Sequence, residues 1–151
     1  MKEYGAAVVG LTMDDSGIPP DAASRIAVAK KIVERAESYG IPREDILIDS
    51  LVLGVCSDSN AAKVTLETIN GVRQELGVNL TLGASNVSFG LPDREAINSM
   101  FLAMAIQCGV NAPIVNPRYA YQTILISDLL LGHDEFAMNY IRYYRKRTAA
   151  G

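Results

Sequence analysis

Small and amide side chains follow an apolar run in the middle of the chain. Residues 78–82 have the length and composition of a buried strand, and they lead into Gly83, Ser85 and Asn86. A tight turn over residues 88–92 comes next, before a new helical pattern. In parallel α/β proteins, polar groups that follow strands line the face where ligands bind. We therefore expect this stretch to contribute to a ligand site.

A carboxylate occupies a comparable position earlier in the chain. Asp49 directly follows the apolar residues 46–48, inside an expected strand and away from any helix start. Its position leaves a ligand-binding role and a structural role equally open. Asn86 has the same two interpretations, because an amide among small residues also stabilises turns.

Three further polar residues stand at expected strand ends and have a structural explanation. Asp14, Asp58 and Asn116 are placed where side chains cap helices or hydrogen-bond to loops. Asn116 precedes Pro117, and an amide followed by proline is typical of a helix start. We expect capping to be the main role of Asn116.

The elements that position these residues repeat along the chain. Helical patterns end at Gly40, Gly77 and Gly109, and an apolar segment of strand length follows each of them within a few residues. With the first apolar segment, this predicts four βα units in a parallel sheet, and right-handed crossovers place all four strand ends on one face. The expected strands cover residues 6–11, 46–48, 78–82 and 112–115, and the unbroken apolar run of the first predicts burial on both of its faces.

Apolar stripes define the expected helices. The first is expected to begin at Asp21 or a neighbour, and its stripe is Ala22, Ile26, Ala29, Val33 and Ala36. The stripe of the second helix is Ala62, Leu66, Ile69, Val72 and Leu76, and that of the third is Ile97, Phe101, Met104 and Cys108. Residues 119–131 and 134–147 predict two closing helices. We describe residues 1–151 as one domain, with four βα units over 1–131 and a terminal helix over 134–147.

Composition excludes several classes of function. The chain has 151 residues, 49% of them hydrophobic, which is enough to bury a core. Its net charge of -3 gives no indication of a basic surface for nucleic acid. Two cysteines are too few for a disulfide framework or a zinc site, which favours a reduced, cytoplasmic protein. We expect no signal peptide, and residues 124–131 are too short to span a membrane.

The face formed by the carboxyl ends of the expected strands, which we call the rim, also lacks the residues of several common catalytic sites. The only histidine, His133, lies between the two closing helices, where a structural role is expected. Hydrolytic triads and zinc hydrolysis are therefore unfavourable interpretations. The glycines between residues 83 and 90 do not have the spacing of a dinucleotide-binding fingerprint.

Four runs of sequence resemble a known family. They are GLTMDDSGIP (residues 10–19), ILIDSLVL (46–53), LGASNVSFGLPDREAIN (82–98) and FLAMAIQCGVNAPIVNP (101–117). These runs resemble the methyltetrahydrofolate:corrinoid protein methyltransferases, the pterin-binding barrel family that includes the folate domain of cobalamin-dependent methionine synthase. The resemblance covers nearly the whole chain, and the run SNVSFGLP is its most specific part.

The resemblance implies the carboxyl-terminal half of a (β/α)8 TIM barrel, with four parallel strands, their helices and a closing C-terminal helix. It also implies transfer of the N5 methyl group of methyltetrahydrofolate to Co(I) of a corrinoid (cobalamin) carried by a partner protein. By this resemblance Asn86 is the catalytic amide and Asp49 binds the pterin. Gly83 and Ser85 would let the backbone approach the ring, and Ser88 would support Asn86.

The expected roles agree with simple chemistry. The pterin edge presents an N–H beside an amino group, and the two oxygens of Asp49 can accept both hydrogen bonds. The methyl group leaves a tertiary amine, which departs readily only if N5 gains a proton or a strong hydrogen bond. The Asn86 amide both donates and accepts, so it can stabilise N5 increasingly as the bond breaks.

The chain departs from the family in size. A complete barrel has eight units and about 250 residues. By the resemblance the four units here are the last four, so we expect the remaining pterin-anchoring aspartate and asparagine to belong to a half outside this chain. Exposed strand edges and apolar interior favour association with a second copy or with an N-terminal half-barrel. One alternative is an assembly module without catalysis. Another is a different pterin enzyme such as dihydropteroate synthase, which ranks last because the strand ends lack a lysine and arginine phosphate-binding pattern.

Overall fold

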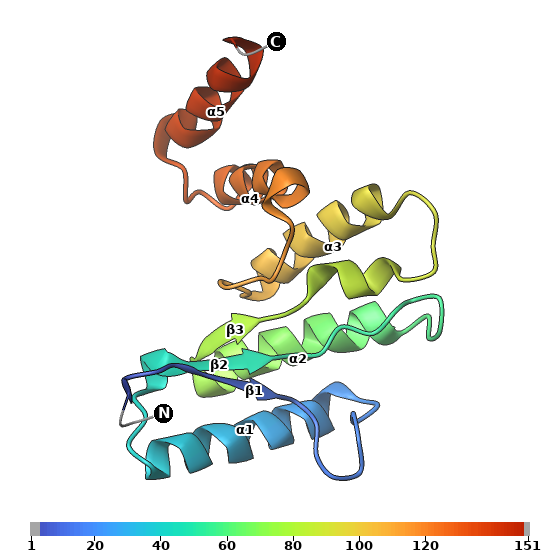
Figure 1. The fold of residues 1–151 in the computed structure, drawn as a ribbon, viewed down its shortest axis with the longest axis vertical. Helices are drawn as coiled ribbons and strands as arrows, with labels where there is room; N and C mark the ends of the chain where they lie inside the picture. The colour runs from blue at the N-terminus through green and yellow to red at the C-terminus, as the bar shows by residue number, and fades with distance from the viewer. Residues whose placement is uncertain (1–3, 150–151) are drawn as a thin grey trace.

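A parallel three-stranded sheet forms the centre of the computed structural model, which describes residues 4–149. The strands β1 (Val8–Leu11), β2 (Ile46–Asp49) and β3 (Asn79–Thr81) lie in the order β1-β2-β3. The helices α1 (Ala22–Ser38) and α2 (Ala61–Leu76) connect them and run side by side (Figure 1). The structure thus has the alternating βα pattern that the sequence predicts.

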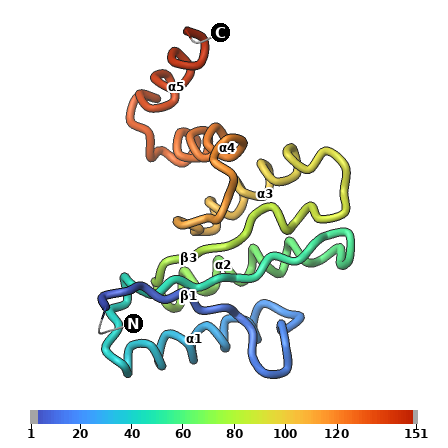
Figure 2. Tube along the Cα trace, viewed as in Figure 1, coloured from blue at the N-terminus to red at the C-terminus, as the bar shows by residue number. Residues whose placement is uncertain are grey.

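The remaining elements extend the molecule beyond β3. They are the 3-10 helix η3 (Ala84–Ser88), α3 (Arg94–Cys108), α4 (Pro117–Leu130), the 3-10 helix η4 (Glu135–Ala137) and α5 (Met138–Ala149). One more 3-10 helix, η2 (Arg43–Asp45), comes earlier and directly precedes β2. The path of the chain in Figure 2 shows α5 projecting from the end of α4, far from the sheet. No helix within residues 4–149 is long and apolar enough to cross a membrane.

Local capping residues set the helix boundaries, as predicted. An oxygen of Asp21 accepts a hydrogen bond from the Ser24 amide (2.8 Å) at the start of α1. Gly77, with φ of 61°, ends α2 in the left-handed conformation that glycine adopts without strain. Asn116 accepts from the Arg118 amide (3.0 Å) where α4 begins. The expected capping role of Asn116 is confirmed.

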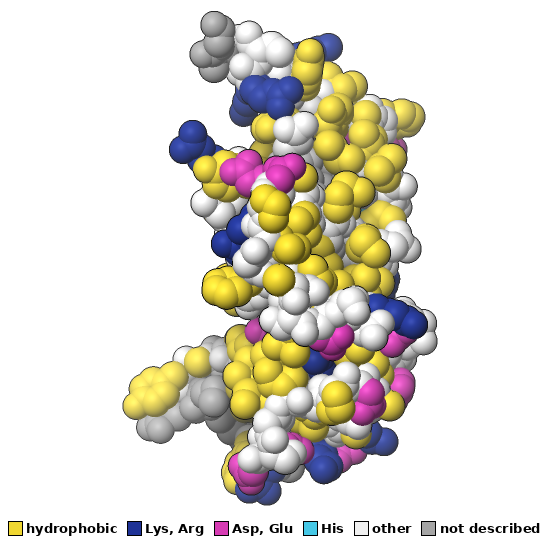
Figure 3. Space-filling view, turned by 90° about the vertical axis from the view of Figure 1, so that its right-hand side faces the viewer, with side chains coloured by type: hydrophobic (Ala, Val, Ile, Leu, Met, Phe, Trp, Pro, Cys, Tyr) yellow, Lys and Arg dark blue, Asp and Glu magenta, His cyan; other side chains and the backbone are white. Residues whose placement is uncertain are grey.

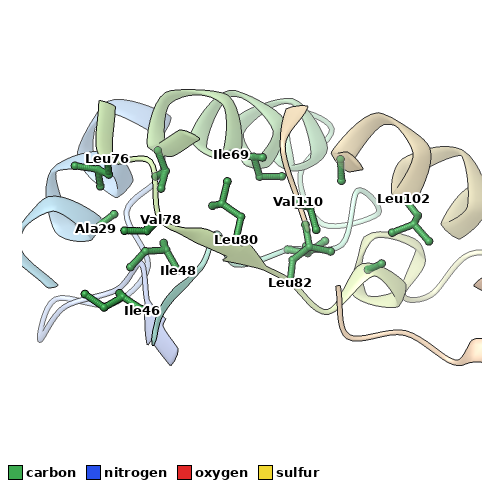
Figure 4. Packing of buried hydrophobic residues seen from close by; sticks show 14 of the residues in the cluster. Ala29, Ile46, Ile48, Ile69, Leu76, Val78, Leu80, Leu82, Leu102 and Val110 are labelled. Atoms are coloured by element: carbon green, nitrogen blue, oxygen red, sulfur yellow. The ribbon is translucent and has the colours of Figure 1, made fainter. Parts of the chain in front are cut away.

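The hydrophobic core lies between one face of the sheet and the helices. Ile46 and Ile48 of β2 and Leu80 of β3 are at most 1% exposed and pack with residues of α1 and α2 such as Ile69 (Figure 4). Close contact between α1 and α2 depends on Gly71, because a Cβ there would overlap the side chain of Ile26. Burial of these residues is the main source of stability for the fold.

The opposite face of the sheet is open, and here the sequence prediction was wrong. Val9 is 53% exposed and Leu11 is 43% exposed, although both belong to a strand expected to be buried on both faces. Within residues 4–149, α1 and α2 cover only one face, so alternate residues of β1 remain accessible. Figure 3 views the molecule from the side toward which the strands point, and hydrophobic side chains occupy much of it.

The predicted fourth strand, residues 112–115, is reduced to a single parallel bridge between Gly83 and Ile114. The Ile114 amide donates to the Leu82 carbonyl (2.8 Å), and the Thr81 hydroxyl donates to the Ala112 carbonyl (2.7 Å). Pro113 has no N–H to donate, so a regular ladder cannot continue through it. The sheet therefore has three strands among the described residues, not the predicted four.

Two helical predictions also need correction. Met104, assigned to the apolar stripe of the third helix, is 52% exposed, while Leu102 and Ala105 are buried. The terminal helix predicted over residues 134–147 begins only at Met138, because the chain first makes a 3-10 turn with a left-handed residue at Phe136 (φ 53°). Neither feature alters the strand ends.

Candidate functional site

Asp49 ends the central strand of the sheet, in register with Leu11 and Thr81 of the neighbouring strands. Its carboxylate is half-buried and accepts a hydrogen bond from the Leu51 amide to Oδ1 (2.9 Å). Burial raises the pKa of Asp49, and the Leu51 N–H partly opposes this shift. The Asp49 carbonyl accepts from both the amide and the hydroxyl of Thr12, which fixes the strand end. A weakly solvated carboxylate in this position can bind a ligand with paired N–H donors.

The loop after Asp49 is held by an arginine that the sequence analysis missed. Arg25 of α1 is 1% exposed, and its Nη1 donates to the carbonyls of Ser50 (3.1 Å) and Leu51 (2.9 Å). Its Nε donates to the carbonyl of Pro19 (2.9 Å). One signal was available, because Arg25 lies one helical turn before Ala29, on the face that α1 buries. A charged residue in that position requires buried hydrogen-bond partners.

Asn86 lies in η3, at the end of β3, with an exposed side chain. Its amide group lies against Gly83, where an added Cβ would approach Asn86 Nδ2 to 3.2 Å. The Asn86 backbone N–H also donates to the Gly83 carbonyl (3.2 Å). Gly83 therefore leaves room for the Asn86 amide, and the exposed amide is free to contact a ligand.

Ser88 is fully buried beneath the same turn. Its hydroxyl donates to Asn98 Oδ1 (2.7 Å) and accepts from Arg94 Nε (3.0 Å). Arg94 also donates through Nη2 to the carbonyl of Ser85 (2.8 Å). Ser88 thus ties the Asn86 turn to α3, and its hydroxyl does not hydrogen-bond to the Asn86 side chain itself. Arg94 and Asn98 were not singled out by the sequence analysis.

The structure brings the two main candidates to the same edge of the sheet. Asp49 and Asn86 follow the neighbouring strands β2 and β3, whose carboxyl ends point the same way (Figure 1). The loops that carry them are joined by a hydrogen bond from the Val55 amide to the Val87 carbonyl (3.0 Å). The predicted rim therefore exists, with a carboxylate and an exposed amide on adjoining loops.

Other polar residues of the rim have structural partners. Asp14 is exposed, and its Oδ1 accepts from the amide and the hydroxyl of Ser16. These hydrogen bonds lower the pKa of Asp14. Asp58 accepts from the Asn60 amide (2.9 Å) before α2. Both aspartates stabilise loops, as their positions predicted.

His133 lies at the other end of the sheet. It shares a cavity wall with Gly77 and Val78, which precede β3, and its Nδ1 is 3.6 Å from Asp128 Oδ1. No group of three or more histidine, cysteine or acidic residues within residues 4–149 is arranged to hold a metal ion.

A cavity of about 110 Å³ lies beside the candidate site, between η3, α3 and the start of α4. Apolar residues such as Leu102 and Val115 form its floor, and Ser85 and Asn98 stand at its polar edge. Neither Asp49 nor Asn86 lines this cavity. The candidate site is therefore distinct from this cavity.

A family model described as "Pterin binding enzyme" matches residues 1–116. The chain belongs to the pterin-binding enzyme family. This result confirms the resemblance that the strand-end sequences indicate. The candidate residues Asp49 and Asn86 both fall within the matched range.

Relatives with assigned names agree with this family. The chain is 28% identical over 142 residues to a methylcorrinoid:tetrahydrofolate methyltransferase of Eubacterium limosum, covering 92% of this chain and 52% of that protein. It is 34% identical over 122 residues to the methionine synthase of Mycobacterium leprae (strain TN), covering 76% of this chain and 10% of that protein. The methionine synthase of Mycobacterium tuberculosis (strain ATCC 25618 / H37Rv) is 33% identical over the same length, with the same coverage. The chain thus spans about half the length of the first relative and a tenth of the other two.

Proposed function

We propose that this chain contributes a pterin site to a methyltransferase that moves the N5 methyl group of methyltetrahydrofolate to Co(I) of a corrinoid protein. The observation that carries the proposal is the half-buried Asp49 carboxylate at the end of β2, with the exposed Asn86 amide in the turn that follows the neighbouring strand β3. The family match and the names of the relatives support the substrate class. Methyltetrahydrofolate and the corrinoid are both substrates in this scheme, and the corrinoid arrives on a partner protein.

Asp49 is the proposed anchor for the pterin ring. Its Oδ1 already accepts one hydrogen bond from the Leu51 amide, which fixes the orientation of the carboxylate. The other oxygen and the remaining lone pair of Oδ1 can accept from a ring N–H and the adjacent amino group. Such charge-assisted hydrogen bonds are each worth about 1.5–3 kcal/mol.

Asn86 is the proposed catalytic residue. During transfer the Co(I) electron pair forms the bond to the methyl carbon, while the pair of the broken N5–C bond stays on N5 and N5 takes up one proton. The Asn86 amide is exposed at the turn and can hydrogen-bond to N5 throughout this change. Gly83 leaves space for the amide, while Ser85 and Ser88 take part in the hydrogen bonds that hold the turn.

The reverse direction is the second candidate function. The Eubacterium limosum relative is named for methyl transfer from a methylcorrinoid to tetrahydrofolate. A catalyst that stabilises the transition state accelerates both directions. Starting the assay from a methylated corrinoid and tetrahydrofolate decides whether this chain also supports the reverse transfer.

The open face of the sheet bears on how the site is completed. Val9 and Leu11 of β1 are 53% and 43% exposed, which is unusual for apolar strand residues. We propose that this face is covered by a second copy of the chain or by an N-terminal half-barrel. Light scattering is expected to show an oligomer of the isolated chain, and a monodisperse monomer would count against self-association. Methyl transfer by the associated protein separates an enzyme from an assembly module without catalysis.

Calorimetric titration with methyltetrahydrofolate tests the proposed site. Asp49→Asn is expected to weaken binding about 10- to 100-fold, because one or more charge-assisted hydrogen bonds are lost. Asn86→Ala is expected to lower the rate of methyl transfer more than the affinity. Asp14→Asn is the matched control, since Asp14 is exposed on the same rim and bonds only to its own loop. Equal affinities for Asp49→Asn and the wild type would refute the proposed anchor.

A further inference from the structure

Arg25 is the most deeply buried cation described in the chain. It is 1% exposed, and within residues 4–149 it forms no ion pair. Its three hydrogen bonds go to main-chain carbonyls, one in the loop after β1 and two in the loop after β2. A charge buried in this way is costly, and an apolar side chain would fill the same position more cheaply. The cost points to a task beyond packing.

The Ser50–Leu51 peptide connects Arg25 to the candidate site. In a trans peptide the C=O and N–H groups point in opposite directions. Arg25 Nη1 donates to the Ser50 carbonyl (3.1 Å), and the Leu51 N–H of the same peptide donates to Asp49 Oδ1 (2.9 Å). The guanidinium and the carboxylate therefore hold opposite ends of one peptide unit. A chain of this kind polarises the peptide and strengthens both hydrogen bonds.

Leu51 adds a second reason for the clamp. Its φ is 53°, a left-handed conformation that a leucine rarely adopts. The Leu51 carbonyl accepts from Arg25 Nη1 (2.9 Å) and shares the Thr65 hydroxyl proton (3.2 Å) with the Ala61 carbonyl (3.0 Å). Both donors come from helices that pack on the far side of the sheet. These hydrogen bonds offset the strain and keep the Leu51 N–H directed at Asp49.

We propose that Arg25 is a positioning residue that orients the Asp49 carboxylate through the Ser50–Leu51 peptide. Arg25 touches no substrate in this scheme and acts only on the hydrogen bond that Asp49 accepts. The effect on ligand affinity rests on the proposed pterin site, whereas the effect on the Asp49 carboxylate does not. The two can therefore be tested separately.

The test compares Arg25→Lys with the wild type in a carbon-13 NMR titration of the Asp49 carboxyl and a calorimetric titration with methyltetrahydrofolate. A lysine ammonium keeps the charge and lacks the planar fork that reaches both loops. We expect Arg25→Lys to raise the pKa of Asp49 further and to weaken methyltetrahydrofolate binding about tenfold. Adding Leu51→Gly is expected to recover part of both losses, because glycine adopts positive φ without strain.

The matched control is Arg43→Lys. Arg43 also donates to a main-chain carbonyl, that of Leu76 (2.9 Å), but it precedes β2 and lies at the opposite end of the strand from Asp49. This variant is expected to leave the Asp49 titration and the affinity unchanged. An unchanged Asp49 titration in folded Arg25→Lys would overturn the proposal, since a purely structural role predicts lower stability alone.

Two outcomes remain informative if a variant or the ligand fails. If Arg25→Lys does not fold, the double variant with Leu51→Gly, which relieves the strained backbone at Leu51, is titrated in its place and must show a higher pKa of Asp49 than Leu51→Gly alone. No rise relative to Leu51→Gly would then overturn the proposal. If the wild type does not bind methyltetrahydrofolate, the proposed function fails, and the Asp49 titration still decides the role of Arg25.

Discussion

Replacing Ser88 with alanine should destabilise the protein far more than its small change in volume suggests. Ser88 is fully buried, and its hydroxyl donates to Asn98 Oδ1 and accepts from Arg94 Nε. Removing a buried hydroxyl that serves two partners costs about 1–3 kcal/mol. Arg94 is exposed and keeps its bond to the Ser85 carbonyl, so only the Asn98 oxygen loses a well-placed donor. We therefore expect a loss of about 2 kcal/mol in the free energy of unfolding.

Ser127→Ala provides the matched control, because Ser127 is a buried serine that loses the same atom. Its hydroxyl donates to the Thr123 carbonyl one turn earlier in α4, a bond within a single helix. Alanine also has the higher helix propensity, so the expected change is within about 0.5 kcal/mol. Urea unfolding followed by circular dichroism measures both variants, with the slope against urea as the check for a two-state transition. Equal losses for Ser88→Ala and Ser127→Ala would refute the assigned role of the hydroxyl network.

Three other changes test the fold and its charges. Burial raises the pKa of Asp49, so the folded protein binds the carboxyl proton more tightly than the unfolded chain does. The free energy of unfolding therefore falls as the pH rises from the pKa of Asp49 in the unfolded chain to its pKa in the folded protein. Asp49→Asn should remove that slope and stabilise the protein above this range in urea titrations at several pH values. Asp134 accepts from two amides at the start of α5, so Asp134→Ala should reduce helical circular dichroism. Gly71→Ala should lower the melting temperature, because its Cβ would overlap Ile26.

Features set by nearby residues were predictable from the sequence. Asp21, Gly77 and Asn116 act on the helix that they begin or end, and each does so in the structure. The position of Asp49 at a strand end follows from the same local pattern. Asn86 could be placed on the same edge because parallel strands with right-handed crossovers share the direction of their carboxyl ends.

Features that depend on distant partners were not predictable in the same way. The apolar run of β1 indicates burial, yet the sequence pattern does not specify what covers each face, and Val9 remains exposed. The segment 112–115 has the composition of a strand, but Pro113 removes a donor, and its remaining hydrogen bonds do not form a ladder. The sequence pattern therefore identifies apolar segments, but it does not show which strands pair or which elements cover them.

The clamp on Asp49 shows why the supporting residues of a site are hard to find. Arg25 is separated from Ser50 by 25 positions, and its partners are carbonyls, which carry no side-chain signature. The strained Leu51 has no sequence signal either, because leucine is not a residue that normally marks a positive φ. Only the charge of Arg25 on an apolar helix face stands out. A charged residue on a helix face that is otherwise buried is therefore the one feature of this arrangement that the sequence could have shown.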